Sequence, residues 1–456
     1  MASISPEETA PVREVSDLVS VFHAAEKPLS RFLLGAEAEK FAVQRETFRP
    51  LAYDGELGVT RVLEALTEYG WQPEHEYEGG PLVALRRGSA SITLEPGAQL
   101  ELSGAALPDV HAVSAEFDQH LEELVPISEK LKLIWLGVGF QPLARQEELP
   151  WVPKHRYPIM REYLPTKGAA AHDMMLRTAT VQVNLDYANE ADAMRKLRLG
   201  LLLSPLLNAI TANSPLREGQ RSGMKSLRGN VWLHMDPARS GLIRRVFEKR
   251  HVGYADYVEW ALDAGMFLIK RGGRVLKNTG QTFRDFLAHG FEGERATLAD
   301  WKLHLNTLFP EVRLKNTIEL RSCDTQPRSL TPSISALAAG LFYDDRALIE
   351  AEDLAASLGL EAVERARPDL VTHGLAASIA GLPMRALGEQ LLDIARGGLE
   401  RRERKNAEGK SESIYLDPLI ALTESGRTPA DVVLEGLTSE GPLSARDIVE
   451  STRLNR

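Results

Sequence analysis

Residues 31–43 read RFLLGAEAEKFAV and place two carboxylates, Glu37 and Glu39, two positions apart in a mostly apolar run. Side chains alternate between the two faces of a β-strand, so both carboxylates would point to the same side. The run therefore predicts a buried strand with one acidic face. If that face is enclosed, a cation must lie near it, because an unpaired buried charge is costly.

Three further segments carry polar side chains at the same period of two. The polar positions are Glu95, Gln99 and Glu101 in TLEPGAQLELS (93–103), Gln182 and Asn184 in TATVQVNLDY (178–187), and Glu319 and Arg321 in TIELRSCD (317–324). We expect Pro96-Gly97 to form a bulge. The alternate positions are apolar, so one sheet could show all the polar groups on one face and pack helices on the other.

Two interpretations of that face remain open: an ordinary solvated face, or a face that binds metal. Acids and amides, rather than a mixture of Thr, Lys and Ser, occupy it. Carboxylates so close raise one another's pKa unless cations intervene. Hard divalent cations prefer oxygen ligands, and Mg²⁺ with nucleotide phosphates is the usual case. Arg321, two positions after Glu319, would then bind phosphate.

The composition is that of an ordinary globular protein. The chain has 456 residues, 43% hydrophobic and 26% charged, with a formal net charge of -10. The acidic balance argues against nucleic-acid binding. The longest apolar run, which begins at Leu199, is too short to span a membrane. The single cysteine, Cys323, excludes an internal disulfide.

Strands separated by helices of variable length, with an antiparallel meander over 74–103, favour the α+β class. We expect a loose tail over residues 1–13 and one domain over 14–456, mostly helical from 330 to 456. A long helix should run from about Asp109 to Lys132. Gly137-Val138-Gly139 follows a predicted strand, but no third glycine completes a dinucleotide-binding loop.

Six separated motifs carry a family resemblance. They are GAEAEKF, LEPGAQLELSG, RYPIMREYLP, TATVQVNLDY, LRGNVWLHMDPARSG and LFPEVRLKNTIELRSCD. In this order they make the chain, over roughly residues 15–450, similar to the glutamate–cysteine ligases of plants and many proteobacteria. The resemblance implies a curved antiparallel sheet that forms a funnel-shaped active site, with helices outside, as in glutamine synthetase-like carboxylate–amine ligases.

The resemblance also implies an activity: ATP- and Mg²⁺-dependent joining of the γ-carboxylate of L-glutamate to the amine of L-cysteine, through a γ-glutamyl phosphate. This is the first step of glutathione biosynthesis, with ATP as co-substrate and roughly two or three Mg²⁺ ions. Two alternatives stay open. One is a sister ligase that activates glutamate for a different amine, and the other is a ligase-like protein that only binds metal or nucleotide.

Site residues follow from the matching motifs. The implied metal ligands are Glu37, Glu39, Glu95, Glu101, Gln182 and Glu319. Arg321 matches a catalytic phosphate-binding arginine, and Gln182 a metal or phosphate contact. Arg228 matches a catalytic arginine that holds glutamate, and Gln99, which lies between two of the acids, is expected to bind substrate. Arg239 is either a substrate-binding or a surface arginine, and Met160 lines either the cysteine pocket or the core.

The expected partners are L-glutamate, L-cysteine and ATP, with no nucleic acid and no membrane. The expected assembly is a monomer or a weak homodimer. Plant members of the family carry paired cysteines and a long plastid targeting segment. Neither is found in this sequence, which predicts a bacterial cytoplasmic enzyme.

Overall fold

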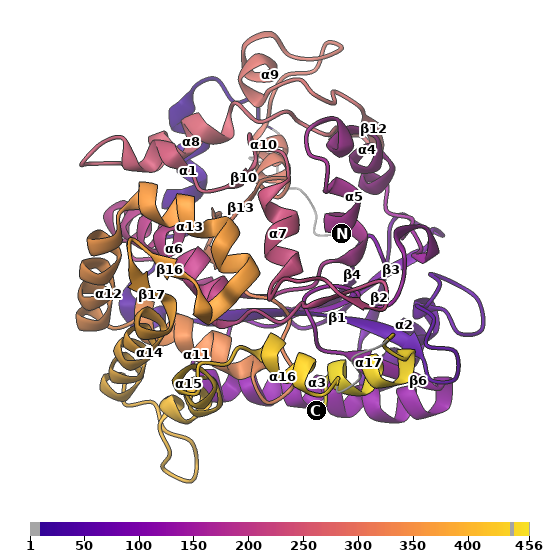
Figure 1. Cartoon of the computed structure of the whole chain (residues 1–456). Coiled ribbons are helices and arrows are strands. Elements are labelled where there is room, and N and C mark those ends of the chain that lie inside the picture. The colour runs from indigo at the N-terminus through magenta and orange to yellow at the C-terminus, as the bar shows by residue number, and fades with distance from the viewer. Residues whose placement is uncertain (1–9, 438–441, 456) are drawn as a thin grey trace.

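A large antiparallel sheet organises the protein, whose computed structural model describes residues 10–437 and 442–455. The sheet has nine strands in the order β14-β15-β7-β1-β5-β4-β3-β2, with β6 paired to β1 (Figure 1). Its strands are β1 (Leu34–Gln44), β2 (Gln72–His75), β3 (Leu82–Arg87), β4 (Ala90–Leu94), β5 (Leu100–Ser103), β6 (Leu133–Leu136), β7 (Val181–Leu185), β14 (Val312–Leu314) and β15 (Ile318–Leu320). Mixed helices and antiparallel strands confirm the predicted α+β class.

Strand β1 is the hub of the sheet. Its first half lies between β7 and β5, and its second half pairs with β6. In this register Glu39 is opposite Glu101, and Glu37 is opposite Gln182. Directly opposed residues share a face. The pairing therefore confirms that the polar positions of separate strands lie on one face of one sheet.

Helices cover both faces. The helices are α1 (Val15–His23), α2 (Val59–Leu66), α3 (Val110–Leu131), α4 (Arg156–Tyr163), α5 (Ala171–Arg177), α6 (Glu190–Ile210), α7 (Leu227–Leu233), α8 (Tyr254–Ala261), α9 (Phe283–His289), α10 (Leu298–Leu305), α11 (Thr331–Phe342), α12 (Asp345–Leu358), α13 (Leu360–His373), α14 (Met384–Arg401), α15 (Asp417–Glu424), α16 (Pro429–Glu435) and α17 (Ala445–Thr452). Helices α3 and α11 pack on the side of β1 away from α4, α5 and α7 (Figure 1). The polar face of the sheet therefore looks toward α4, α5 and α7.

Local sequence accounts for the long helices. Helix α3 begins where the Asp109 side chain accepts a hydrogen bond from the Ala112 N–H, and it ends at Lys132 in a left-handed conformation. Side-chain capping of this kind satisfies one of the free N–H groups of the first turn. Helix α6 contains the apolar run from Leu199 and is buried along most of its length. Within residues 10–437 and 442–455, no helix combines the length and the apolar character needed to cross a bilayer.

The segment around Pro96-Gly97 forms a turn between β4 and β5, rather than the predicted bulge. The Ala98 N–H donates to the Glu95 carbonyl, and the Glu95 N–H donates to the Gln99 carbonyl. Proline cannot donate to a strand ladder, which favours a chain reversal here. A Cβ on Gly97 would lie 2.4 Å from the Leu176 carbonyl oxygen, so only glycine fits against α5. Glu95 therefore lies just beyond the end of β4, at the base of the turn and opposite Gln99.

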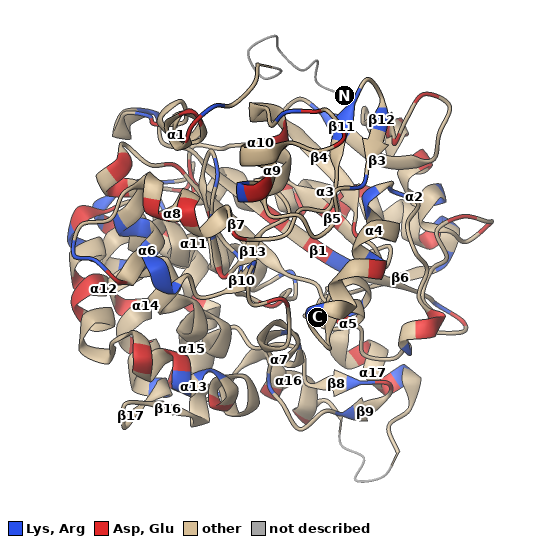
Figure 2. Ribbon diagram, turned by 90° about the horizontal axis from the view of Figure 1, so that it is seen from above, with Lys and Arg blue, Asp and Glu red and all other residues tan. Residues whose placement is uncertain are grey.

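The ends of the chain and the surface show the remaining features. Of residues 1–13, expected as a loose tail, residues 1–9 lie outside the described part. Val12 is buried, and its N–H donates to the Ala296 carbonyl at 2.8 Å. Acidic and basic residues alternate over the outer helices, while both signs also occur on β1 at the centre of the fold (Figure 2). The charges on β1 are the ones that need a functional explanation.

Candidate active site

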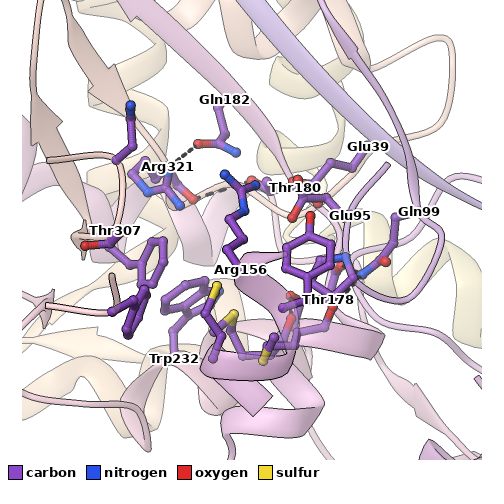
Figure 3. A pocket seen from close by; sticks show the side chains of 18 of the residues that line it. Glu39, Glu95, Gln99, Arg156, Thr178, Thr180, Gln182, Trp232, Thr307 and Arg321 are labelled. Atoms are coloured by element: carbon purple, nitrogen blue, oxygen red, sulfur yellow. Dashed lines mark hydrogen bonds between the residues drawn. The ribbon is translucent and has the colours of Figure 1, made fainter. Parts of the chain in front are cut away.

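A cavity lies on the polar face of the sheet, enclosed by α4, α5, α7 and residues 303–309. Seven residues singled out from the sequence line it: Glu39, Glu95, Gln99, Met160, Gln182, Arg228 and Arg321. Figure 3 shows Arg321 and Gln182 on one side of the cavity and Glu39 and Glu95 on the other. The walls therefore carry opposite charges.

The acidic side is built by strand pairing. Glu39 accepts a hydrogen bond from the Thr180 N–H at 2.9 Å, and Glu37 accepts one from Asn184 Nδ2 at 2.8 Å. Glu101, opposite Glu39, accepts hydrogen bonds from the hydroxyls of Thr93 and Ser103. Each of these carboxylates is thus held in place by polar neighbours and keeps lone pairs for further ligands.

These carboxylates crowd one another. Burial, followed by the charges of Glu319 and Glu101, raises the pKa of Glu37 to about 7. Burial, followed by the charges of Glu95 and Glu101, raises the pKa of Glu39 well above its ordinary value. A carboxylate group that resists ionisation gains free energy when a cation approaches it. The electrostatics of this face therefore favour the binding of positive charge.

No three Asp, Glu, His or Cys side chains of the described residues are gathered tightly enough to form a ready metal site. The acidic side is a row of electrostatic neighbours along β1, β5 and the β4–β5 turn. Its donor chemistry, buried carboxylate oxygens, is that of a site for a hard cation such as Mg²⁺.

The basic side centres on Glu319, which is fully buried and surrounded by cations. Arg313 donates to both of its oxygens at 2.8 and 3.0 Å, Lys315 lies 3.1 Å away, and Arg321 donates to it as well. Burial alone would raise the pKa of Glu319, but the three cations outweigh burial and hold that pKa well below its usual range. Arg321 also donates to the Gln182 side-chain oxygen at 2.6 Å. Sequence reasoning missed Arg313 and Lys315, although both follow the period of two on β14 and just after it.

Two more arginines face the cavity. Arg228, at the start of α7, donates through Nη1 to the Ser322 carbonyl at 3.0 Å and through Nη2 to the Arg321 carbonyl at 2.7 Å. A guanidinium has five N–H donors, so these two hydrogen bonds leave further donors for a ligand. Arg156, at the start of α4, lies against the Tyr157 ring and makes no ion pair with any residue that the structure describes. Sequence reasoning quoted the motif around Arg156 but did not select this side chain.

The apolar part of the cavity is rich in methionine. Its lining includes Met160, Met174, Met175, Met266 and Phe267. Thioethers form a soft, polarisable surface that offers few hydrogen bonds. This wall and the charged walls belong to the same cavity, so a ligand with charged ends and a soft side chain would match it.

Arg239 has a different place from the one considered in the sequence. It is fully buried outside the cavity lining, where it pairs with Asp236 at 2.8 Å and donates to the carbonyls of Thr307 and Gly265. Its guanidinium also lies 4.4 Å from the centre of the Phe267 ring. All these contacts support the cavity wall, so we assign Arg239 to structure and not to substrate binding.

The antiparallel sheet and the oppositely charged walls of its cavity form a site suited to anionic ligands that bind together with cations. The chain belongs to glutamate–cysteine ligase family 2, whose family model matches residues 33–451. It is 39% identical over 428 residues to the chloroplastic glutamate–cysteine ligase of Brassica juncea, covering 93% of this chain and 81% of the relative. The corresponding Arabidopsis thaliana enzyme is 38% identical over 438 residues, covering 95% and 82%.

A solved structure supports the fold. The glutamate–cysteine ligase of Francisella tularensis, crystallised in complex with AMP, superposes with a TM-score of 0.50 at 11% identity, covering 92% of this chain and 87% of that one. The predicted family and architecture are therefore confirmed.

The predicted cytoplasmic location is contradicted. The similar enzymes of Brassica juncea and Arabidopsis thaliana are both named as chloroplastic. A net acidic charge and a single cysteine suit either compartment, so composition could not decide between them.

Proposed function

We propose that this protein is a glutamate–cysteine ligase that uses ATP to join the γ-carboxylate of L-glutamate to the amine of L-cysteine. The observation that carries the proposal is the placement of the family motif residues in one cavity: the acids Glu39 and Glu95 and the arginines Arg228 and Arg321 all line it. A glutamate, a nucleotide phosphate and an amine acceptor need both kinds of wall.

The chemistry explains why arginines line the site. A carboxylate is a poor electrophile, so ATP must first phosphorylate the γ-carboxylate of glutamate. In that step two anions, the γ-carboxylate and the triphosphate of ATP, must come together. Fixed guanidinium groups offset their repulsion. We assign Arg321 to the transferring phosphoryl group, because its fork is already oriented by Gln182 and Glu319. Arg228 and Arg156 keep free donors and are assigned to the carboxylates of glutamate.

We assign Mg²⁺ to the acidic side of the cavity. Glu37, Glu39, Glu95 and Glu101 would hold it, with Gln182 and Glu319 reaching it from the basic side. When bound, Mg²⁺ supplies charge neutralisation for the ATP phosphates. The raised pKa values of Glu37 and Glu39 support this assignment, because burial and the neighbouring carboxylates outweigh the nearby charges of Lys315 and Arg228.

The methionine wall supports cysteine as the acceptor. Its side chains, including Met160, offer no strong hydrogen-bond partner to a hydroxyl. Serine would therefore lose hydration without compensation at this wall, whereas a thiol loses little. This observation favours a thiol over a hydroxyl but leaves 2-aminobutyrate, a similar apolar side chain, as an acceptable substitute.

Acceptor-dependent release of ADP tests the proposal. Purified protein with ATP, Mg²⁺ and glutamate is supplied with cysteine, 2-aminobutyrate, serine, glycine or ammonia, and the γ-glutamyl product is identified by mass spectrometry. We expect cysteine to give the highest kcat/KM and Glu39→Gln to abolish turnover. If no ADP is released with any of these acceptors, the ligase activity is refuted. A clear preference for glycine or ammonia would select the sister ligase instead.

A further inference from the structure

We propose that Asp324 is the positioning residue for Arg228. Gly139 must be a glycine because any side chain there would collide with the Asp324 carboxylate. The inference rests on the proposed function, in which Arg228 binds a carboxylate of glutamate. Neither Asp324 nor Gly139 lines the cavity. Their role is to hold a side chain that does.

The Asp324 carboxylate is fully buried and collects donors from several segments. Oδ2 accepts hydrogen bonds from the Asn213 N–H at 2.9 Å and the Ser214 hydroxyl at 2.6 Å, and Oδ1 accepts one from the Ser226 hydroxyl at 3.0 Å. Arg228 Nη1 lies 3.7 Å from Oδ1. A buried carboxylate is tolerated only with such a set of partners, so its position is tightly defined.

Asp324 fixes both the backbone and the side chain of Arg228. Ser226 caps α7 by accepting a hydrogen bond from the Gly229 N–H at 2.9 Å, and Ser214 accepts one from the Arg228 N–H at 3.1 Å. Both serines donate to Asp324. The carbonyls that receive the Arg228 guanidinium belong to residues 321 and 322, in the same short segment as Asp324. One carboxylate therefore links the first turn of α7 to the strand end that carries Arg321.

The glycines after β6 make room for this segment. A Cβ on Gly139 would lie 2.5 Å from Asp324 Cγ, and a Cβ on Gly137 would lie 2.9 Å from the Gln326 carbonyl oxygen. Contacts that short do not occur for a real side chain, so both positions need glycine for space. This explains the Gly137-Val138-Gly139 pattern, which does not fit a dinucleotide-binding loop.

Replacing the carboxylate by an amide keeps its shape and breaks this arrangement. In Asp324→Asn an NH₂ group would face hydrogen-bond donors, and the negative charge opposite Arg228 would be lost. The guanidinium would no longer be held at the angle that suits a glutamate carboxylate. We expect KM for glutamate to rise roughly tenfold or more, with KM for ATP within about twofold.

Steady-state kinetics of five variants test the inference. Asp324→Asn, Arg228→Lys and the double variant are compared with Gly139→Ala, which pushes on Asp324 without removing its charge. The matched control is Glu412→Gln. Glu412 is also fully buried and paired with an arginine, Arg402, at 3.0 Å, but it does not line the cavity.

A positioning role predicts a specific pattern. KM for glutamate should rise in Asp324→Asn, Arg228→Lys and Gly139→Ala, and the double variant should be no worse than the worse single one, because both changes remove one interaction. Glu412→Gln should lower the melting temperature and leave KM unchanged.

Three results would overturn the role of Asp324: an unchanged KM for glutamate in Asp324→Asn, multiplicative effects in the double variant, or an equal rise in Glu412→Gln. If Asp324→Asn does not fold, Gly139→Ala decides by the same criterion. A wild-type protein that forms no γ-glutamyl product would instead refute the proposed function.

Discussion

Glu37→Gln should make the protein more stable and less active at the same time. Glu37 is half-buried on β1, close to Glu319 and Glu101, and its pKa is raised to about 7, first by burial and then by those two charges. Glutamine keeps the side-chain oxygen that accepts the hydrogen bond from Asn184. The substitution therefore removes a charge and little else.

The size of the effect follows from the pKa. The difference of about 2.5 between the folded value and the ordinary 4.5 corresponds to about 3 kcal/mol. Between pH 4.5 and 7 the folded protein keeps a proton that the unfolded chain has lost. The free energy of unfolding therefore falls as the pH rises through this window, and stays lower above it. Glu37→Gln should remove this loss. Its free energy of unfolding should exceed that of the wild type by about 1 kcal/mol at pH 5 and by about 3 kcal/mol at pH 8.

Urea unfolding of the wild type and Glu37→Gln at pH 5 and pH 8 measures this difference in free energy of unfolding, with EDTA present to keep metal ions off the carboxylates. Glu78→Gln, at an exposed glutamate between β2 and β3, is the control and should show no such pH dependence. Ligation of glutamate to cysteine by Glu37→Gln should meanwhile fall below detection, since the carboxylate is assigned to Mg²⁺. A stability difference between wild type and Glu37→Gln that is the same at pH 5 and pH 8 would refute the reasoning about burial and like charge.

Three further predictions concern other parts of the site and the sheet. Arg321→Lys should lower kcat by roughly 10²-fold to 10³-fold, because lysine cannot reproduce the oriented fork, and a near-normal kcat would remove Arg321 from phosphoryl transfer. Chelation of Mg²⁺ should stop product formation and its return should restore it, whereas turnover in metal-free buffer would contradict the assignment of the acidic side. Burial lowers the pKa of Lys40 to about 7 from 10.5, so the unfolded chain holds a proton that the folded protein lacks between these values, and wild-type stability should rise with pH across that window. In urea unfolding, Lys40→Met should abolish this rise of stability with pH. If the free energy of unfolding of Lys40→Met rises with pH as steeply as that of the wild type, the prediction is wrong.

Lys40 also illustrates what sequence reasoning overlooked. It follows Glu39 directly and faces the opposite side of β1, where it is buried against His120 at 3.1 Å. The expectation that a cation must accompany the acidic strand was sound in principle. The structure places basic side chains on both sides: Lys40 behind the sheet, and Arg313 and Lys315 beside Glu319 on its polar face.

The sequence by itself determined the features that depend on near neighbours along the chain. Strand alternation put Glu37 and Glu39 on one face, Asp109 set the start of α3, and motif order identified the family. The first two signals arise from contacts two to four residues apart, which a linear pattern records, and motif order is a property of the sequence itself.

Only the tertiary structure decided which groups meet across the cavity. Glu39 meets Thr180, 141 positions away, and Arg228 meets the strand end that carries Arg321, 93 positions away. Folding also placed Glu95 at the base of the β4–β5 turn and buried Arg239 in the cavity wall. Such pairings depend on how strands and helices pack as a whole, and no local period encodes that packing.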